Sequence, residues 1–257
     1  MWWGWMWVFA SLSVTSTSTG KASFHPGKRV RHKANHYARL RKRLQHKGTR
    51  GAKRRIRRIA QRERRLKQQA NHSIAKQIVK EHPHTLLGLE DLTGIRERTR
   101  RRKRRRKKNG KGFERVSPKA RKANRVYSQW SFAELHALIS YKAARSGSLA
   151  VKVDADYTSQ GCPMCGHTTD ENRPGKGLLF VCQNPECRYT LHADLVGART
   201  ITMRTLLVRH DWIRTGCLSL IPDASARFAK AARLSRYAEL RWSLDVTTSL
   251  RSLSGGQ

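Results

Sequence analysis

Four of the five cysteines stand in two closely spaced pairs, Cys162 with Cys165 and Cys182 with Cys187. Two residues separate the first pair, four separate the second, and sixteen lie between the pairs. Thiolates at this spacing suit one tetrahedral Zn²⁺, because each short loop lets both cysteines of a pair reach the same ion. Four thiolates fill the shell and leave no position for a substrate, so the zinc would be structural. The alternatives are a redox pair, unrelated thiols or an iron–sulfur cluster.

Three further side chains could join or compete with this cluster. His167 and His192 lie beside the cysteine pairs, but four cysteines already complete the shell, so we treat both histidines as bystanders. Cys217 stands alone. An odd cysteine count in a basic chain, without the charged start of a signal peptide, does not suggest a disulfide framework. We therefore expect a reducing compartment.

Two carboxylates occupy positions that favour metal chemistry. Glu90 ends the apolar stretch 85–90, which predicts a short buried strand, and Asp194 opens a predicted helix after the second cysteine pair. Because strand residues alternate, only one of Glu90 and Asp91 can face a shared site. Two-metal phosphoryl chemistry needs carboxylates that converge from separate elements, and Glu90 with Asp194 could supply two. The alternative role of Asp194 is a favourable interaction with the helix dipole.

The charge balance points to a polyanionic partner. The 257 residues include 55 Lys and Arg against 17 Asp and Glu, a formal net charge of +38. Nucleic acid is the first candidate and an anionic membrane surface the second. No apolar run approaches the ~20 residues that a membrane span needs. The alternative is a solvated basic surface that touches nothing.

Basic side chains concentrate in two regions. Helical periodicity over 28–47 and 52–80 predicts a helical hairpin, 28–80, with a narrow apolar seam and a Lys/Arg exterior. The segment 96–126 is of low complexity, and we expect it to be disordered until it meets a polyanion. The candidate nucleic-acid contacts in these regions are Arg54, Arg55, Arg57, Arg58, Arg100, Arg101, Arg102, Lys103, Arg104, Arg105 and Arg106.

The remaining elements follow from local patterns. β-forming residues at 8–15 and 20–24 flank a turn at Gly20, which predicts a hairpin. Helices are expected over 132–145 and 191–209, and a strand over 149–154. The tail 210–257 is weakly patterned, with a short basic helix expected around 225–241 and no assigned chemistry.

The first residues carry a signal in another reading frame. Trp and Met each have a single codon, so Trp3–Val8 can be written back as TGG GGN TGG ATG TGG GTN. Starting from the third base, this sequence encodes Gly, then Leu, Met or Val, then Asp-Val-Gly. An apolar strand with a central Asp therefore lies in the shifted frame, and we interpret it as a frameshift in the gene or in the recorded sequence.

The cysteine and acid motifs resemble one family. The stretch Tyr157-Thr158-Ser159-Gln160-Gly161-Cys162-Pro163-Met164-Cys165-Gly166, the second cysteine pair and His192-Ala193-Asp194-Leu195-Val196-Gly197-Ala198-Arg199 are similar to TnpB (OrfB) proteins. Gly88-Leu89-Glu90-Asp91-Leu92 resembles the second acidic motif of their RuvC-like nuclease. These insertion-sequence proteins are described as transposases and are similar to RNA-guided effectors of type V CRISPR systems. The resemblance covers roughly 14–205.

The resemblance implies an α/β fold: an RNase H-like (RuvC) core with a long basic helical hairpin and an inserted four-cysteine zinc ribbon. Residues 1–156 and 188–209 would form the core, 157–190 the ribbon and 210–257 an unassigned basic tail. The implied activity is Mg²⁺-dependent DNA cleavage in transposition, with Glu90 and Asp194 as catalytic metal ligands. DNA and a guide RNA are the implied partners, and a bacterial-type cytoplasm, associated with the nucleoid, is the expected location.

Three departures from the family put the activity in doubt. The first acid, which belongs on the first strand in a Gly-apolar-Asp-apolar-Gly context, is missing from this frame. The N-terminal half that recognises guide RNA and target DNA is also missing, and Gly197 replaces the usual Asn after the third acid. We therefore expect a truncated chain with little or no cleavage. The alternatives are a non-catalytic zinc-ribbon module that binds DNA or RNA, and an inactive relic of a mobile element.

Overall fold

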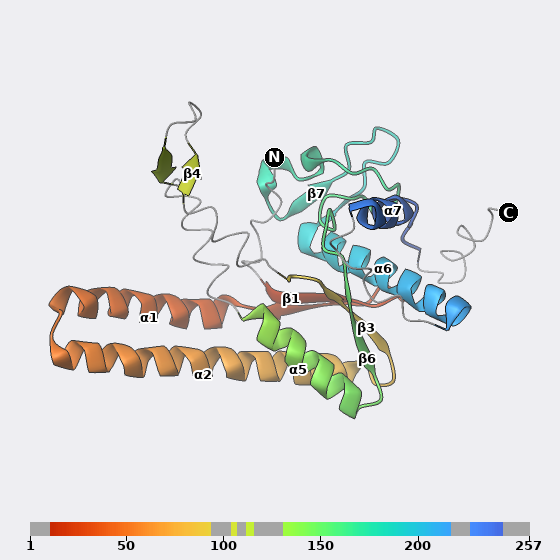
Figure 1. Cartoon of the computed structure of the whole chain (residues 1–257). Helices are drawn as coiled ribbons and strands as arrows, with labels where there is room; N and C mark the ends of the chain where they lie inside the picture. Colours follow the sequence, from red (N-terminus) through yellow and green to blue (C-terminus); the bar gives the residue numbers. More distant parts are fainter. Residues whose placement is uncertain (1–10, 94–103, 107–111, 116–130, 217–226, 244–257) are drawn as a thin grey trace. The chain divides into compact units, whose positions relative to one another are not determined.

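The computed structural model describes residues 11–93, 104–106, 112–115, 131–216 and 227–243 (Figure 1). They belong to two compact units. The first, here called the sheet unit, takes 1–27, 82–91 and 143–257, and the second, the hairpin unit, takes 28–81 and 92–142. The frame-shifted segment, most of the basic segment 96–126 and the end of the tail fall outside the described residues.

The sheet unit begins with the expected hairpin. Strands β1 (Ser11–Ser16) and β2 (Ala22–Pro26) pair antiparallel, with Val14 opposite Phe24. Gly20 adopts a positive φ of 86° in the connecting turn, a conformation that costs glycine little. The prediction of strands on either side of Gly20 is confirmed.

A parallel strand pair forms the second sheet of this unit. β3 (Leu86–Glu90) pairs with β6 (Leu149–Val153), from Leu86 opposite Leu149 to Glu90 opposite Val153. Val151 and Val153 are buried on one face of β6, which lies within the strand expected over 149–154. The described strands of the chain form four two-stranded sheets, and a single continuous mixed sheet is not among them.

Helix α6 (Ala193–Thr215) packs on β1, β3 and β6 (Figure 1). His192 caps its first turn, since Nδ1 accepts a hydrogen bond from the Asp194 N–H at 3.3 Å. Gly216 ends it in the left-handed conformation, so the helix runs six residues beyond the expected end at 209. The approach to β3 is close: a Cβ on Gly88 would lie 1.7 Å from Thr205 Oγ1.

The zinc-ribbon region lies between β6 and α6 in sequence. Its antiparallel strands are β7 (Leu179–Val181) and β8 (Thr190–His192), preceded by 3-10 turns at Asp170–Asn172 and Pro174–Lys176. Phe180 is fully buried against cysteines of both pairs. Gly166 has a φ of 78° directly after the first pair, a conformation that glycine adopts at little cost.

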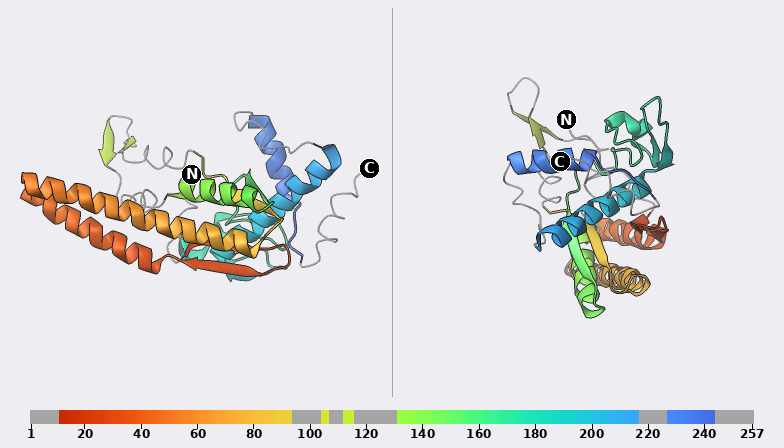
Figure 2. Two further views of the ribbon diagram at one scale, coloured as in Figure 1. Left: turned by 90° about the horizontal axis from the view of Figure 1, so that it is seen from below. Right: turned by 90° about the vertical axis from the view of Figure 1, so that its right-hand side faces the viewer.

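The hairpin unit is dominated by two long helices, α1 (Lys28–Lys47) and α2 (Arg50–Glu81), which lie side by side (Figures 1 and 2). Leu44, Ala52 and Ile59 form the buried seam, with Tyr37, Leu40 and Ile56 beside it. The predicted hairpin is confirmed. The unit also contains most of α5 (Phe132–Arg145), and the short pair β4 (Arg104–Arg106) and β5 (Phe113–Arg115).

A short helix closes the described chain. α7 (Arg227–Ala238) belongs to the sheet unit, and residues 239–242 continue from it. Leu240 and Trp242 are buried against Met203 and Leu207 of α6. The expected basic helix in the tail is therefore present, within the predicted bounds. None of the helices in the described parts of the chain combines the length and the apolar character that crossing a membrane requires.

Candidate functional site

The four predicted zinc ligands converge. Their sulfur atoms, from Cys162, Cys165, Cys182 and Cys187, all lie within 4.8 Å of one another. The Sγ atoms of Cys162 and Cys187 are 3.7 Å apart, and those of Cys165 and Cys182 are 3.5 Å apart. A tetrahedron with Zn–S bonds of about 2.3 Å has sulfur–sulfur edges of about 3.8 Å. The cluster therefore has the size that Zn²⁺ requires, and a disulfide would need about 2.05 Å.

The protonation of the thiols suits a cation. Burial raises the pKa of Cys162 and of Cys182. Burial also opposes ionisation of Cys165, but hydrogen bonds from the backbone of His167 and from the neighbouring thiols lower its pKa to about 7. Cys165 thus ionises readily, whereas Cys162 and Cys182 stay protonated until a cation compensates their charge. This is the behaviour expected of a site for a thiophilic metal.

A buried amide joins the two halves of the ribbon. Asn172 is fully buried, and its Nδ2 donates to the carbonyls of Gln160 at 2.7 Å and His167 at 3.0 Å. Its Oδ1 accepts from the Gln183 N–H at 2.9 Å. Asn172 therefore fixes the loops that carry both cysteine pairs. The sequence analysis missed it, because a single Asn between two pairs carries no spacing signal.

The two candidate catalytic acids occupy the predicted positions on separate elements. Glu90 is the last residue of β3, and Asp194 lies in the first turn of α6. Both elements belong to the sheet unit, and the charge of Asp194 adds to the raised pKa of Glu90. Asp91 follows β3, and its N–H continues the strand pairing by donating to Val153 O at 2.8 Å.

Both carboxylates sit where a negative charge is poorly solvated. Burial raises the pKa of Glu90 to about 7, and Asp194 adds to the rise, whereas Thr158 and Arg204 oppose it. Burial also raises the pKa of Asp194, against the charges of His192 and Arg173. Buried carboxylates that resist ionisation are a recurrent property of metal and catalytic sites, because a divalent cation compensates the charge that burial disfavours.

Two side chains around Glu90 escaped the sequence analysis. Thr158 Oγ1 lies 3.4 Å from Glu90 Oε1 and 3.1 Å from Ala155 O, and its single hydrogen is donated to one of these acceptors at a time. Arg204 is 3% exposed, donates to the carbonyls of Asp154 and Asp156, and lowers the pKa of Glu90 by its charge. The available signal was an isolated arginine in the otherwise uncharged stretch 201–208 of a helix.

Helix α7 braces this cluster. Tyr237 OH donates to Asp154 Oδ2 at 3.0 Å, and its ring lies under the Arg204 guanidinium, 4.2 Å from the ring centroid. Arg236 holds Asp211 of α6 with two hydrogen bonds of 2.8 and 2.9 Å. The tail region, which had no assigned chemistry, therefore supports the surroundings of Glu90 through Arg204.

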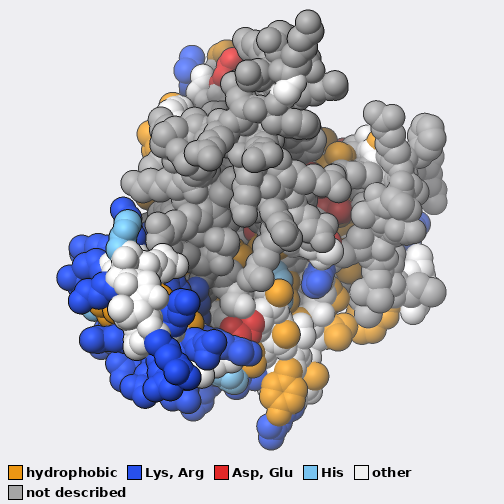
Figure 3. Space-filling view, turned by 60° about the vertical axis from the view of Figure 1, so that its left-hand side comes forward, with side chains coloured by type: hydrophobic (Ala, Val, Ile, Leu, Met, Phe, Trp, Pro, Cys, Tyr) orange, Lys and Arg blue, Asp and Glu red, His pale blue; other side chains and the backbone are white. Residues whose placement is uncertain are grey.

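The hairpin unit carries the described part of the candidate nucleic-acid interface. Lys and Arg side chains gather over it in Figure 3, and the four predicted contacts Arg54, Arg55, Arg57 and Arg58 are all exposed on α2. Inside the hairpin, the buried Glu63 accepts from Arg41 at 2.5 Å and pairs with Lys67 at 3.0 Å. The Arg41–Glu63 pair joins α1 to α2, whereas the Lys67–Glu63 pair lies along α2. Most other cations of the hairpin face solvent.

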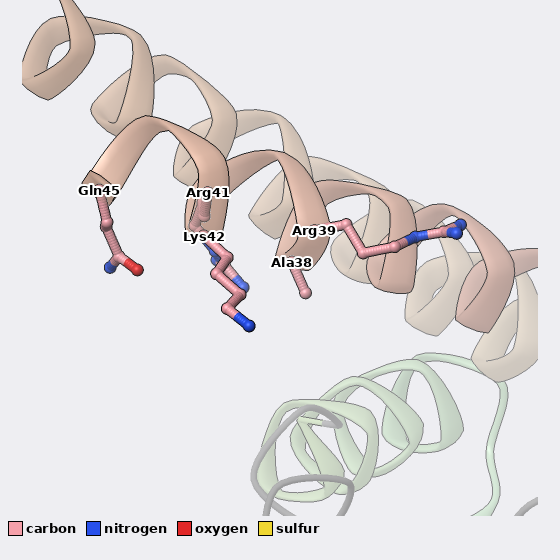
Figure 4. Close-up of a pocket in the computed structure, with 5 residues that line it drawn as sticks. All are labelled: Ala38, Arg39, Arg41, Lys42 and Gln45. Atoms are coloured by element: carbon pink, nitrogen blue, oxygen red, sulfur yellow. The ribbon is translucent and has the colours of Figure 1, made fainter. Parts of the chain in front are cut away.

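A shallow hollow opens on α1. It has a volume of about 400 Å³ and is lined by Ala38, Arg39, Arg41, Lys42 and Gln45 (Figure 4). Its charged lining adds to the basic surface of the hairpin. Of the other predicted contacts, Arg100–Lys103 lie outside the described residues, and Arg104–Arg106 are described by their backbone, in β4.

Comparison with known proteins identifies the ribbon region. Residues 132–201 match the model of the Cas12f1-like, TNB domain family. The TnpB-like protein MJ0751 of Methanocaldococcus jannaschii is 31% identical over 137 residues, which are 52% of this chain and 41% of that protein. The chain is similar to proteins of the TnpB family over these residues. The resemblance carried by the cysteine and acid motifs is thereby confirmed.

A second relative shares the same region. The CRISPR-associated endodeoxyribonuclease Cas12f1 of Sulfoacidibacillus thermotolerans is 36% identical over 80 residues, 31% of this chain and 18% of that protein. The chain thus spans less than half the length of the curated proteins it matches.

The fold comparison extends the likeness beyond the ribbon. The cryo-EM structure of a Cas12f1–sgRNA–target DNA complex matches with a TM-score of 0.50 and 17% identity, over 74% of this chain and 48% of that one. The mixed α/β architecture predicted from the sequence therefore resembles that of Cas12f1.

Proposed function

We propose that the chain contains a RuvC-like nuclease core of RNase H-like fold, in which Glu90 and Asp194 hold Mg²⁺. Residues 1–156 and 188–209 would form the core, with the basic hairpin 28–80 inside it and the zinc ribbon 157–190 inserted before Asp194. The observation that carries the proposal is the pair of poorly solvated carboxylates at the end of β3 and the start of α6.

The residues around the acids have distinct tasks in this proposal. Glu90 and Asp194 would bind the metal, and a bound Mg²⁺ would polarise a phosphodiester oxygen and activate water. Thr158 orients Glu90 by its hydrogen bond, and Arg204 keeps that carboxylate closer to ionisation than burial alone would. The ribbon, held by structural Zn²⁺ on four thiolates, positions the first turn of α6 and with it Asp194.

The partners follow from charge and kinship. The cryo-EM structure of Cas12f1 contains sgRNA and target DNA. The Cas12f1 of Sulfoacidibacillus thermotolerans is named as a CRISPR-associated endodeoxyribonuclease. We propose DNA, with a guide RNA, as the partners of this chain, and a cytoplasmic, nucleoid-associated role in transposition. The exposed arginines of α2 would track phosphates, since the sequence supplies too few acids to balance them.

In the form given by its sequence, the chain is proposed to cleave poorly. Two acids are available where RuvC-like chemistry uses three. Incubation of the purified chain with Mg²⁺ and single- or double-stranded DNA should give little product. Strong cleavage that Glu90→Ala abolishes would contradict this expectation, because it would mean that the two acids suffice.

Binding is tested separately from cleavage. Replacing Arg54, Arg55, Arg57 and Arg58 together by Gln should weaken DNA and RNA binding and lower the slope of log K against log salt by about 3, since each phosphate contact contributes about 0.7–0.9. The matched control removes four exposed cations of the sheet unit, by replacing Lys21, Lys152, Arg188 and Arg209 with Gln. An equal loss in both variants would show that total charge, and not the hairpin, drives binding.

The second candidate function is nucleic-acid binding without catalysis. A non-catalytic binding module would also use the basic hairpin, whose exposed α2 arginines favour it directly. It predicts the same salt dependence but no effect of Glu90→Gln or Asp194→Asn on any Mg²⁺-dependent property. Mg²⁺ titration of the chain, followed by the change in thermal unfolding temperature, separates the two functions.

A further inference from the structure

Tyr157 has a strained backbone. Its φ is 58°, in the left-handed region, where a bulky side chain is rarely found. Glycine or asparagine would make the same turn at lower cost, so the turn alone does not explain a tyrosine here. Backbone strain of this kind gathers at functional sites, and the conformation therefore directs attention to the ring that the strained residue carries.

The loop around Tyr157 is fixed by hydrogen bonds to its carbonyl groups. On one side, the buried Arg204 donates to the carbonyls of Asp154 and Asp156. On the other side, the Tyr157 carbonyl accepts two hydrogen bonds of 3.0 Å from the N–H groups of residues 160 and 161. The backbone that carries the ring is thus held before any ligand arrives, which lowers the entropy cost of binding on it.

The same loop reaches both members of the acid site, Glu90 and Asp194. Thr158, directly after the tyrosine, is buried, and its Oγ1 lies 3.4 Å from Glu90 Oε1. Ser159 Oγ accepts from Arg173 at 3.1 Å. Burial raises the pKa of Asp194, and Arg173 is one of two side chains that oppose the rise. The loop therefore borders the acid site along three consecutive residues.

The ring of Tyr157 is available to a ligand. Tyr157 is 47% exposed, although Thr158 beside it is buried. Tyr237 is a useful contrast, because its ring lies under the Arg204 guanidinium and its hydroxyl donates to Asp154. Within the described ranges of the chain, Tyr157 has neither a ring contact nor a cation contact of this kind.

The chemistry of the loop favours a nucleobase over a phosphate group as the ligand of this ring. Asp154 and Asp156 belong to the same loop, and their carboxylates repel a phosphate. A neutral base needs no cation, because its π-face stacks directly on an aromatic ring. Bases within a duplex already stack on one another, so the ring can take only an unpaired base.

We propose that Tyr157 is a stacking platform for one unpaired base of a single-stranded nucleic acid, placed at the border of the acid site. The strained turn presents the ring, and the fixed carbonyls hold the turn. The stacking contact stands on the exposed ring and the geometry of its loop. Its further role, which is to keep a phosphodiester group of the same strand beside Glu90 and Asp194, rests on the proposed function.

The first measurement locates the base on the full, zinc-loaded chain. The probe is a single-stranded oligonucleotide in which one pyrimidine is 5-iodouracil, a base that long-wavelength light joins to an aromatic ring stacked on it. Mass spectrometry of the digest should find the crosslink on Tyr157. A DNA and an RNA version of the probe carry the same base on different sugars. A Tyr157 crosslink with either version supports the platform, and the version with the higher yield identifies the strand it serves.

The second measurement separates the ring from the fold. Tyr157→Gly suits a φ of 58°, so the variant should stay folded and keep its zinc. It should bind the single strand about tenfold more weakly at high salt, where the phosphate contacts of the basic hairpin are screened. Tyr157→Phe keeps the ring and should bind like the parent. The matched control is Trp212→Ala, which removes another exposed aromatic of the sheet unit and should leave the affinity unchanged.

The outcomes separate the platform from the proposed nuclease. Crosslinks on other residues with none on Tyr157, or equal affinities of the parent and Tyr157→Gly, would overturn the platform even if Mg²⁺ raises the unfolding temperature. A Tyr157 crosslink whose yield rises with Mg²⁺ in the parent, and not in Glu90→Gln, supports the platform and the proposed metal site together. A Tyr157 crosslink that is insensitive to Mg²⁺ supports the platform and contradicts the metal-binding role of the acids.

Discussion

The cysteine cluster and the two candidate catalytic acids both belong to the sheet unit, but they draw their residues from the chain in different ways. The ribbon draws its four ligands from Cys162 to Cys187, a stretch of 26 residues, and forms a closed set of the size that Zn²⁺ requires. The acid site draws Glu90 from β3 and Asp194 from α6, 104 positions apart, and both carboxylates are poorly solvated. A local site can be complete by itself, whereas a site assembled by topology depends on every element that reaches it.

The largest expected effect is the loss of the ribbon. Cys162→Ser removes a buried ligand, and structural zinc in small fingers contributes on the order of 10 kcal/mol of folding free energy. We expect the variant to lose zinc and the ribbon to unfold. Metal analysis measures the first change, and near-UV circular dichroism measures the second. Met164→Ser is the control, since Met164 lies between the first pair and is 42% exposed. Full zinc occupancy in Cys162→Ser would refute the four-thiolate site.

The second prediction concerns the layer that holds the acids. Gly88→Ala places a Cβ 1.7 Å from Thr205 Oγ1, so β3 and α6 must separate. Overpacking of this kind costs about 1–3 kcal/mol, measured by urea unfolding. Thr205→Ala in the same chain should recover part of the loss. Gly51→Ala is the control, because its Cβ meets nothing within 4 Å and helix propensity favours alanine.

The contrast explains which features the sequence could predict. The convergence of the four cysteines, the β1–β2 hairpin, the α1–α2 hairpin and the strands carrying Glu90 and Val153 rest on local spacing and periodicity, and the structure confirms them. Thr158, Arg204 and Asn172 were missed, because their roles arise from contacts between segments far apart in the chain. Glu63 was missed for the same reason: its partner Arg41 lies on the other helix of the hairpin.

The third prediction is that removing a metal-binding side chain changes the folding stability in opposite directions at the two sites. Glu90→Gln keeps the shape of the side chain and removes a carboxylate whose pKa burial raises to about 7. Without added Mg²⁺, the variant should be more stable than the parent at pH 8, by on the order of 1–2 kcal/mol after allowance for solvent screening. Removing a ligand thus destabilises the ribbon and stabilises the acid site.

The pH dependence of Glu90→Gln tests the cause. A folded-state pKa above the unfolded value means that the native chain binds more protons between pH 4.5 and about 7. The parent should therefore lose stability as the pH rises through this window, and Glu90→Gln should lose less. Chemical unfolding at several pH values measures both slopes. Equal slopes would mean that Glu90 is well solvated in the folded chain.

The smallest expected effect concerns Asp211, which anchors α7. Two hydrogen bonds from Arg236 lower the pKa of Asp211, and the Arg236 side chain is 48% exposed. Asp211→Asn should therefore cost only about 1 kcal/mol at pH 7. The stabilisation is present above the ordinary pKa of aspartate and disappears as the pH falls through the lowered value, so the parent and variant should converge in acid. The exposed Glu186→Gln serves as control.

Asp211→Asn also asks how far the acid site depends on α7. The helix carries Tyr237, which contacts Arg204 and Asp154, and Arg204 in turn supports ionisation of Glu90. The described contacts from α7 toward the cysteines are less direct and pass through the Trp242 N–H to Pro163 O, so zinc content should be unchanged while the Mg²⁺ concentration needed to raise the unfolding temperature increases. Loss of zinc in Asp211→Asn would show that α7 supports both sites, through Trp242 and its hydrogen bond to Pro163. The local site would then depend on distant contacts as much as the acid site does.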